Sequence, residues 1–374
     1  GPAVRAVKGH AAPETLHAFS LARDLIDENT SMPEQMRVLY GLWGVQYARG
    51  EHEAGRAVAE QALSRVAGTA DAEPQALANR LLGETLWAMG EFVKARHHLE
   101  RAIDFCGADQ PVTDLRFSLD HKAGALSFLG WTLWALGYQE RAHAVAAEAL
   151  TLSSHVKHAA TTAMALSGLL LLSQFRRDAR ELGERADALA SHCAEHGIGL
   201  FGIWGRFSQG LVRSWNGDPL PGIEAMRVTM EIAERVYADI FRPMHLGFLA
   251  EAYACIGERE RARELLDEAI ARAAKTSECY FEAELHRMRG ELLLAHDEAA
   301  AEASFDRALS IARRQNAKSW ELRAAVSLAR LWRDRGDNDQ AKDLLAPIYS
   351  WFTEGFDTPD LLVARALLDE IRFA

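Results

Sequence analysis

The chain has 374 residues, of which 49% are hydrophobic and 25% are charged, so most of it is expected to fold. Its formal net charge of −11 argues against nucleic acid as a partner, because binding a phosphate backbone needs clustered lysines and arginines. The densest basic cluster, at residues 313–318, is short and fits a solvated helix end.

The cysteines and the apolar runs indicate the compartment. The four cysteines lie far apart and form no CxxC pair, which favours reduced, buried thiols in a cytoplasmic protein. The most apolar run, residues 164–172, is about half as long as a bilayer-spanning helix. We therefore expect no membrane contact, and no signal peptide is visible.

The chain opens with Gly1 and Pro2 in place of an initiator methionine. These two residues resemble the scar left when a tag is cleaved off, so we expect the chain to be a piece of a longer protein. Residues 1–12 are small and polar and are predicted to form a disordered lead-in. Pro13 suits the first turn of a helix, and we expect a single domain over residues 13–374.

The segment from residue 82 to residue 102 predicts two amphipathic helices joined by a tight turn at Gly90. Apolar and small residues recur there at helical spacing on both sides of the turn: Leu82, Gly83, Leu86, Ala95, Leu99 and Ala102. A single hairpin of this kind cannot bury its own apolar surface. It therefore needs similar hairpins on either side.

The same frame recurs along the chain at steps of about 37 to 47 residues. The turn positions are Gly50, Gly90, Gly137, near Gln174, Gly217, Gly257, near Asp297 and Gly336. The expected units occupy roughly 34–67, 74–107, 114–153, 157–196 and 200–236, and three more begin near 243, 277 and 319, with Pro74 and Pro111 in the connections. This pattern predicts an all-α solenoid of about eight helical hairpins with N-terminal and C-terminal capping helices, the closing cap covering about 349–374.

Small residues around the turns, such as Ala142 and Ala149, resemble the tetratricopeptide repeat, which implies a right-handed superhelix. Residues 283–294, 320–332 and 351–358 more specifically resemble the C-terminal repeats of a bacterial multidomain family. In that family an adenylate/guanylate cyclase or winged-helix domain precedes an AAA-type signalling ATPase of the STAND kind, and tetratricopeptide repeats follow. The resemblance covers about residues 14 to 372 and implies an upstream ATPase domain in the same chain.

The search for catalytic chemistry gives a negative result. The GxGxxG match at residues 197–202 follows a helical segment instead of a strand, and no GxxxxGK[ST] motif occurs. His192, Cys193 and His196 have helical ligand spacing but no clear further ligand. We therefore expect a non-catalytic chain with no cofactor and no metal.

A second stripe on the first helix of each unit is offset from the packing stripe, and in tetratricopeptide solenoids it lines the concave groove. In units one to three the candidate groove residues are Tyr40, Tyr47, Arg80, Glu84, Trp87, Trp131 and Trp134. Large aromatic residues on a groove wall suit recognition of a peptide, a helix or a flat ligand. The alternative is that these rings are buried against the next unit.

In units seven and eight the same stripe is charged, and its candidate residues are Arg287, Glu291, Arg323, Arg330 and Arg333. These residues favour a solvated or salt-bridged wall over an anion site. Two functions remain. Either the repeats are a sensor that binds a protein, a peptide or a small-molecule effector in its concave groove and regulates an upstream domain, or they are a constitutive oligomerisation scaffold with no ligand.

Overall fold

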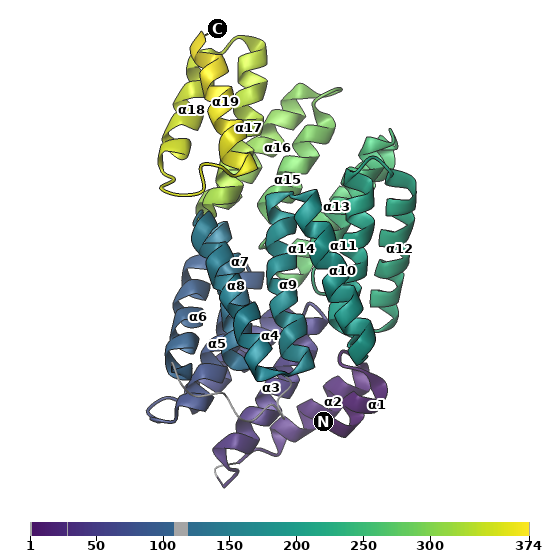
Figure 1. Ribbon diagram of the computed structural model, residues 1–374, viewed down its shortest axis with the longest axis vertical. Helices are drawn as coiled ribbons and strands as arrows, with labels where there is room; N and C mark the ends of the chain where they lie inside the picture. Colours follow the sequence, from purple (N-terminus) through teal and green to yellow (C-terminus); the bar gives the residue numbers. More distant parts are fainter. Residues whose placement is uncertain (1, 28, 108–118, 374) are drawn as a thin grey trace.

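The computed structural model describes residues 2–27, 29–107 and 119–373, which form 19 α-helices and contain no strand. Sixteen helices pair into eight antiparallel hairpins, so the predicted all-α solenoid is confirmed (Figure 1). The first four hairpins are α3 (Met32–Ala48) with α4 (His52–Arg65), α5 (Ala72–Ala88) with α6 (Phe92–Cys106), α7 (His121–Ala135) with α8 (Gln139–Val156), and α9 (Ala159–Arg176) with α10 (Ala179–His196). The last four are α11 (Gly199–Trp215) with α12 (Pro219–Arg235), α13 (Arg242–Cys255) with α14 (Arg259–Thr276), α15 (Glu282–Leu293) with α16 (Glu298–Arg314), and α17 (Lys318–Arg335) with α18 (Asn338–Ser350).

Three further helices flank the hairpins. Helices α1 (Pro2–Lys8) and α2 (Pro13–Asp24) precede them at the bottom of Figure 1, and α19 (Pro359–Phe373) packs on α17 and α18 at the top. This agrees with the expected capping helices. The predicted start of unit three at 114, with Pro111, lies outside the described residues.

The turns inside the hairpins explain the glycine spacing. Six of the eight turns place a glycine in the left-handed region, with φ from +69° at Gly50 to +95° at Gly137, where a side chain is disfavoured. In the fourth hairpin Arg177 takes this conformation with φ +57°. In the seventh, the carboxylate of Asp297 accepts a hydrogen bond of 2.9 Å from the N–H of Ala300 and so caps α16.

The superhelix winds back on itself, so hairpins six and seven lie against hairpins one and two. The backbone N–H groups of Asp239 and Ile240 donate to the carbonyl oxygen of Ala48, at 2.9 and 3.2 Å. Those of Cys279 and Tyr280 donate in the same way to Ala88, at 2.9 and 3.1 Å. Both acceptors are the last residue of a helix, whose carbonyl groups have no partner within the helix.

Hairpin eight repeats this contact on hairpin three with a side chain, because the hydroxyl of Ser319 donates to the carbonyl oxygen of Trp134. The amide of Gln139 donates to the same hydroxyl at 2.8 Å. We call these contacts, together with those at Ala48 and Ala88, the inter-turn seam. A buried pair lies beside it, with His52 Nε2 3.1 Å from Glu278 Oε2, and burial raises the pKa of Glu278.

Two expectations differ from the structure. Residues 2–8 form α1 in place of a disordered lead-in, and the following loop is held by His10, whose Nε2 lies 3.1 Å from the carbonyl oxygen of Gly44. Of the four free cysteines, Cys106 and Cys193 are buried as expected, but Cys255 is exposed. Within the described ranges no helix is long and apolar enough to cross a membrane.

Gly90 tests the inter-turn seam because a Cβ atom there would lie 2.4 Å from Gln315 Nε2, across the seam. Gly217 has a similar left-handed φ, but a Cβ atom there would meet nothing within 4 Å. We expect Gly217→Ala to lower the free energy of unfolding by about 1 to 2 kcal/mol through backbone strain alone. Gly90→Ala is expected to cost about 1 to 3 kcal/mol more, because it adds a packing clash.

Urea unfolding of both variants measures this difference. Equal losses of stability would show that the seam contributes nothing at this position.

Candidate functional site

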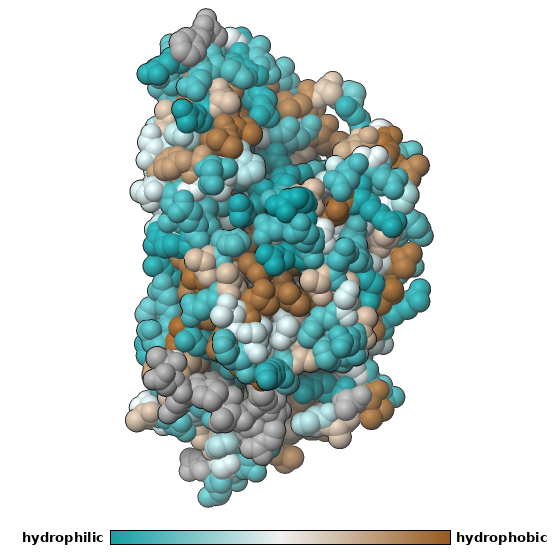
Figure 2. Space-filling model, viewed as in Figure 1, coloured by the Kyte–Doolittle hydropathy of each residue, from teal (hydrophilic) through white to brown (hydrophobic). Residues whose placement is uncertain are grey.

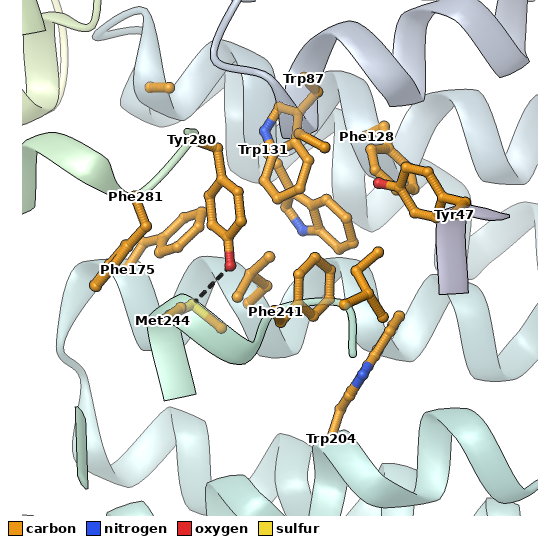
Figure 3. Close-up of a cluster of buried hydrophobic side chains, with 14 of the residues drawn as sticks. Tyr47, Trp87, Phe128, Trp131, Phe175, Trp204, Phe241, Met244, Tyr280 and Phe281 are labelled. Carbon is orange, nitrogen blue, oxygen red and sulfur yellow. Dashed lines mark hydrogen bonds between the residues drawn. The ribbon is translucent and has the colours of Figure 1, made fainter. Parts of the chain in front are cut away.

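The middle of the superhelix interior is filled by aromatic side chains. The central aromatic cluster consists of Trp87, Phe128, Trp131, Trp134, Phe175, Phe241, Tyr280 and Trp320 (Figure 3 shows most of these rings). Its rings come from both superhelical turns: Trp87 stacks on Tyr280 with centroids 4.3 Å apart, and Trp134 meets Trp320 edge to face at 4.6 Å. The hydroxyl of Tyr280 donates to the sulfur of Met244 at 3.3 Å.

The expectation that Trp87, Trp131 and Trp134 line an open groove needs correction, because each is at most 1% exposed. These rings do face the concave side of the first three hairpins. The next superhelical turn covers that side, and Tyr280 and Trp320 seal it. The alternative stated above, burial against another unit, describes all three tryptophans.

The remaining predicted groove residues of the first two hairpins come together around one cavity of about 270 Å³, which we call the apolar chamber. Tyr40, Tyr47, Arg80 and Glu84 all line it. Further walls come from segments that carried no site prediction, including α9, the start of α11 and the N-terminal residues. Their aromatic and aliphatic side chains include Trp43, Phe128, Met164, Phe201, Trp204 and Ile240.

One ion pair lies in the wall of the apolar chamber. Arg80 Nη1 donates to Glu84 Oε1 at 2.9 Å, and the Arg80 guanidinium lies 5.4 Å from the centre of the Tyr40 ring. Burial raises the pKa of Glu84, and the charge of Arg80 opposes this effect. The Nε and Nη2 atoms of Arg80 are buried and make no hydrogen bond with a described residue.

A second cavity, of about 580 Å³, lies in the C-terminal half, and we call it the charged chamber. It is lined by the end of α9 and by α13, α14, α15, α17 and the start of α19. Figure 2 shows this face of the molecule hollowed below the C-terminal helices, with hydrophilic side chains nearby. Four predicted residues line the chamber: Arg287, Glu291, Arg323 and Arg330.

Most charges of this chamber are paired. The Nε and Nη2 atoms of Arg287 donate to the two carboxylate oxygens of Glu284, both at 2.8 Å, and Nη1 donates to Glu291 at 3.0 Å. Arg323 donates to Asp360 at 2.9 Å and lies over the rings of Trp134 and Trp320. This part of the stripe is the salt-bridged wall that the sequence favours.

Three arginines in the charged chamber form no ion pair with a carboxylate of a described residue: Arg176, Arg330 and Arg259, whose Nη1 lies 2.7 Å from His296 Nε2. Arg330 is exposed, and Arg176 is half-buried with an Nε that makes no hydrogen bond; neither forms an ion pair with a described residue. Arg333, one turn after Arg330, lies outside the chamber and pairs with Asp334 at 2.7 Å and with Glu370. The structure therefore separates two arginines that the sequence places on one wall.

Several lining residues were missed by sequence reasoning. Arg176 ends α9, Glu251 lies on α13, and Asp360 begins α19. Their helices are distant in sequence and meet only because the superhelix winds back. Glu251 lies on a first helix and could have been found by extending the stripe to unit six, whereas nothing local distinguishes the other two.

The described residues contain no group of three or more His, Cys, Asp or Glu side chains that could hold a metal ion. Both chambers combine apolar walls with a few fixed charges, the arrangement typical of ligand pockets.

Comparisons with known proteins identify the fold. No family model matches the sequence. An uncharacterized protein of Rhizobium meliloti (strain 1021) is 27% identical over 221 residues, a match that covers 57% of this chain and 21% of that protein. The matched segment therefore spans about a fifth of this relative's length.

Two solved structures resemble nearly the whole chain. A Rap protein complexed with Competence and Sporulation Factor has a TM-score of 0.63 at 12% identity, covering 96% of this chain and 97% of that one. The Rap conjugation gene regulator of plasmid pLS20, in complex with the Phr* peptide, has a TM-score of 0.52 at 11% identity, covering 96% and 95%. At these identities the likeness shows the fold alone, that of a tetratricopeptide-like helical solenoid.

Because Trp87 is core, its removal is expected to affect stability directly. Trp87→Ala should lower the free energy of unfolding by about 3 to 5 kcal/mol, as a large cavity replaces a fully buried ring. The exposed side chain of Leu220 provides the control, and Leu220→Ala should change stability by about 0.5 kcal/mol or less. Thermal or urea melts measure both, and a near-wild-type melt of Trp87→Ala would contradict the burial.

The interior also holds a neutral imidazole. His245 on α13 lies against Phe207 with ring centroids 4.0 Å apart, and burial lowers its pKa from 6.5 to about 3. Between these two values the unfolded chain binds a proton at this residue and the folded chain does not. The free energy of unfolding therefore falls as the pH drops below 6.5 and stops falling near pH 3.

This titration predicts a pH dependence of stability. From pH 7 to pH 5, His245 should account for a loss of about 2 kcal/mol in the free energy of unfolding. His245→Gln removes the titrating group and should reduce the loss by this amount, whereas exposed His97→Gln should leave it nearly unchanged. Urea unfolding of the three proteins at both pH values measures the effect, and equal losses in all three would contradict it.

Proposed function

We propose that the chain is a non-catalytic sensor and interaction domain that binds an acidic peptide in the charged chamber and thereby regulates an output domain of a longer protein. The observation that carries this proposal is the charge of the chamber. Six arginines and three carboxylates line it, and Glu284 lies behind the wall as a fourth carboxylate. The chamber thus has an excess of positive charge in a chain whose net charge is −11.

The unpaired arginines define what the ligand supplies. Arg176 and Arg330 retain guanidinium donors that no described carboxylate satisfies. A guanidinium group binds a carboxylate through two parallel hydrogen bonds, which makes arginine the preferred partner of such groups. A peptide with an acidic side chain and a free C-terminal carboxylate supplies two of them.

The size and the floor of the chamber also suit a peptide. Its volume of about 580 Å³ lies within the range of about 300 to 1,000 Å³ that is usual for ligand pockets. Between the charges, the floor is apolar and contains Met288, Leu292, Leu322 and Val326. An extended peptide presents both apolar side chains and charged groups, so it complements a surface of this mixed kind.

The comparisons support this proposal without testing it. One of the two Rap structures is, by its description, a complex with a peptide. The match to a fifth of the rhizobial relative suits a domain that works within a longer chain. The signalling ATPase upstream of the repeats, and the output domain that it would control, come from the sequence resemblance and remain part of the proposal.

The position of the charged chamber between the two superhelical turns offers a way for peptide binding to change the winding of the solenoid. The walls of this chamber come from α9 in the first superhelical turn and from α15, α17 and α19 in the second. A ligand that contacts Arg176 and Arg330 together links the two turns and favours the closely wound form. A ligand shifts a conformational equilibrium only through such a difference in affinity between two forms.

Peptide binding is tested with two pools of fluorescein-labelled hexapeptides. One pool carries a fixed Asp and a free C-terminus; the other carries Asn and an amidated C-terminus. We expect fluorescence anisotropy to show binding of the acidic pool alone. Arg330→Ala should weaken it about tenfold or more, because a charge-assisted hydrogen bond contributes about 1.5 to 3 kcal/mol.

Arg333→Ala is the matched control, since Arg333 lies on the same helix but is paired outside the chamber. It should leave peptide binding unchanged. Equal binding of both pools, or equal losses in the two variants, would contradict the proposal. Absence of binding together with a stable oligomer in light scattering would favour the alternative of a constitutive scaffold.

A further inference from the structure

The apolar chamber is a second hollow that peptide binding in the charged chamber leaves unexplained. The two chambers share no lining residue, and the central aromatic cluster lies between them. Phe128 lines the apolar chamber and contacts Trp87, while Arg323 lines the charged chamber and lies over Trp134. Each hollow can therefore hold its own ligand.

The size of the apolar chamber limits its occupant to a small molecule. Its volume of about 270 Å³ lies just below the range of about 300 to 1,000 Å³ that is usual for pockets of drug-sized ligands. The walls are mostly aromatic and aliphatic, with Trp43, Phe128 and Trp204 among them. Walls of this kind hold water poorly and gain dispersion contacts when an apolar body fills the space.

The charges at the wall select the polar group of that molecule. Arg5, Arg80 and Glu84 line the chamber, and Arg5 forms no ion pair with a described residue. His10 also lines it, and burial together with the charge of Arg5 lowers its pKa to about 4, so it is neutral near pH 7. With Arg5 and Arg80 positive and Glu84 negative, the wall of the apolar chamber has an excess of one positive charge.

Arg80 adds a specific need for a hydrogen-bond acceptor. It is 1% exposed, its Nη1 is bonded to Glu84 at 2.9 Å, and Tyr40 is a second side-chain hydrogen-bond partner, but its Nε and Nη2 have no acceptor among the described residues. A buried donor without a partner is unfavourable, and a guanidinium edge with two free N–H groups has the geometry that a carboxylate matches.

We propose that the apolar chamber binds a small monocarboxylate with an apolar body, such as a medium-chain alkanoate or an arylalkanoate. Its carboxylate faces Arg80 and Arg5, and its body lies against Trp43, Phe128 and Trp204. A cationic amphiphile would add to the excess positive charge. A neutral one would leave that charge unbalanced, so both classes bind more weakly.

The test is isothermal titration calorimetry of the whole chain with hexanoate, octanoate and 3-phenylpropionate, and with octanamide as the uncharged match of octanoate. We expect at least one of the carboxylates to bind with a stoichiometry of one. Octanamide should bind about tenfold or more weakly than octanoate, because it lacks the charge that the guanidinium pairs with.

Two variants assign the site. Arg80→Met with Glu84→Leu removes the ion pair as a unit, which keeps the fold because apolar groups often replace a buried pair without loss of stability. It should weaken octanoate binding about tenfold or more. Ala160→Phe, at the chamber wall on α9, fills the space and should abolish binding, while Arg330→Ala in the charged chamber should leave it unchanged.

Circular dichroism melts confirm that each variant is folded before it is titrated. The proposal is overturned if none of the three carboxylates binds, if octanamide binds as tightly as octanoate, or if either apolar-chamber variant binds octanoate like the wild type. The peptide assay of the charged chamber is independent of all these measurements, so the failure of one proposal leaves the other standing.

Discussion

The hydrogen bonds of the inter-turn seam decide the form of the whole interior. At Ala48 and Ala88 they use carbonyl groups at helix ends, which have no partner within the helix and would otherwise face water. Once these groups are paired, hairpins six to eight are held against hairpins one to three. The concave face of a solenoid, which is usually an open groove, is then covered by the second superhelical turn over its middle part.

The covered interior is packed with side chains in its middle and contains a cavity on either side of this packed part. In the middle, Trp87 and Trp131 from the first turn meet Tyr280 from the second, and little space remains. Towards either end a cavity remains. The chamber near the N-terminal helices keeps mostly apolar walls, while arginines and carboxylates surround the one near the C-terminal helices.

The helices and the turns of the hairpins could be predicted from the sequence. The glycine period identifies the hairpin turns because a left-handed backbone nearly requires glycine, and the helices then follow to within a few residues. The winding could not be predicted, since the seam joins backbone atoms of residues such as Asp239 and Ala48 that carry no local signal. The sequence does place Tyr40 and Trp87 on one helical stripe. It does not distinguish them, although Tyr40 lines a cavity and Trp87 is part of the core, because this difference depends on the winding.

The position of the central aromatic cluster has a consequence for regulation. Rings that contact one another run from Phe128 at the apolar chamber through Trp87 and Tyr280 to Phe175 and Trp134, which lies beneath Arg323. Close-packed rings do not shift singly, so this continuous set of contacts is a physical route by which a displacement at one chamber would reach the other. Thermodynamic linkage requires the resulting coupling to be reciprocal: a carboxylate that tightens peptide binding must itself be bound more tightly, by the same factor, when the peptide is present. With both proposed ligands bound, two cavities separated by one packed core would combine two chemical signals in the degree of superhelical winding.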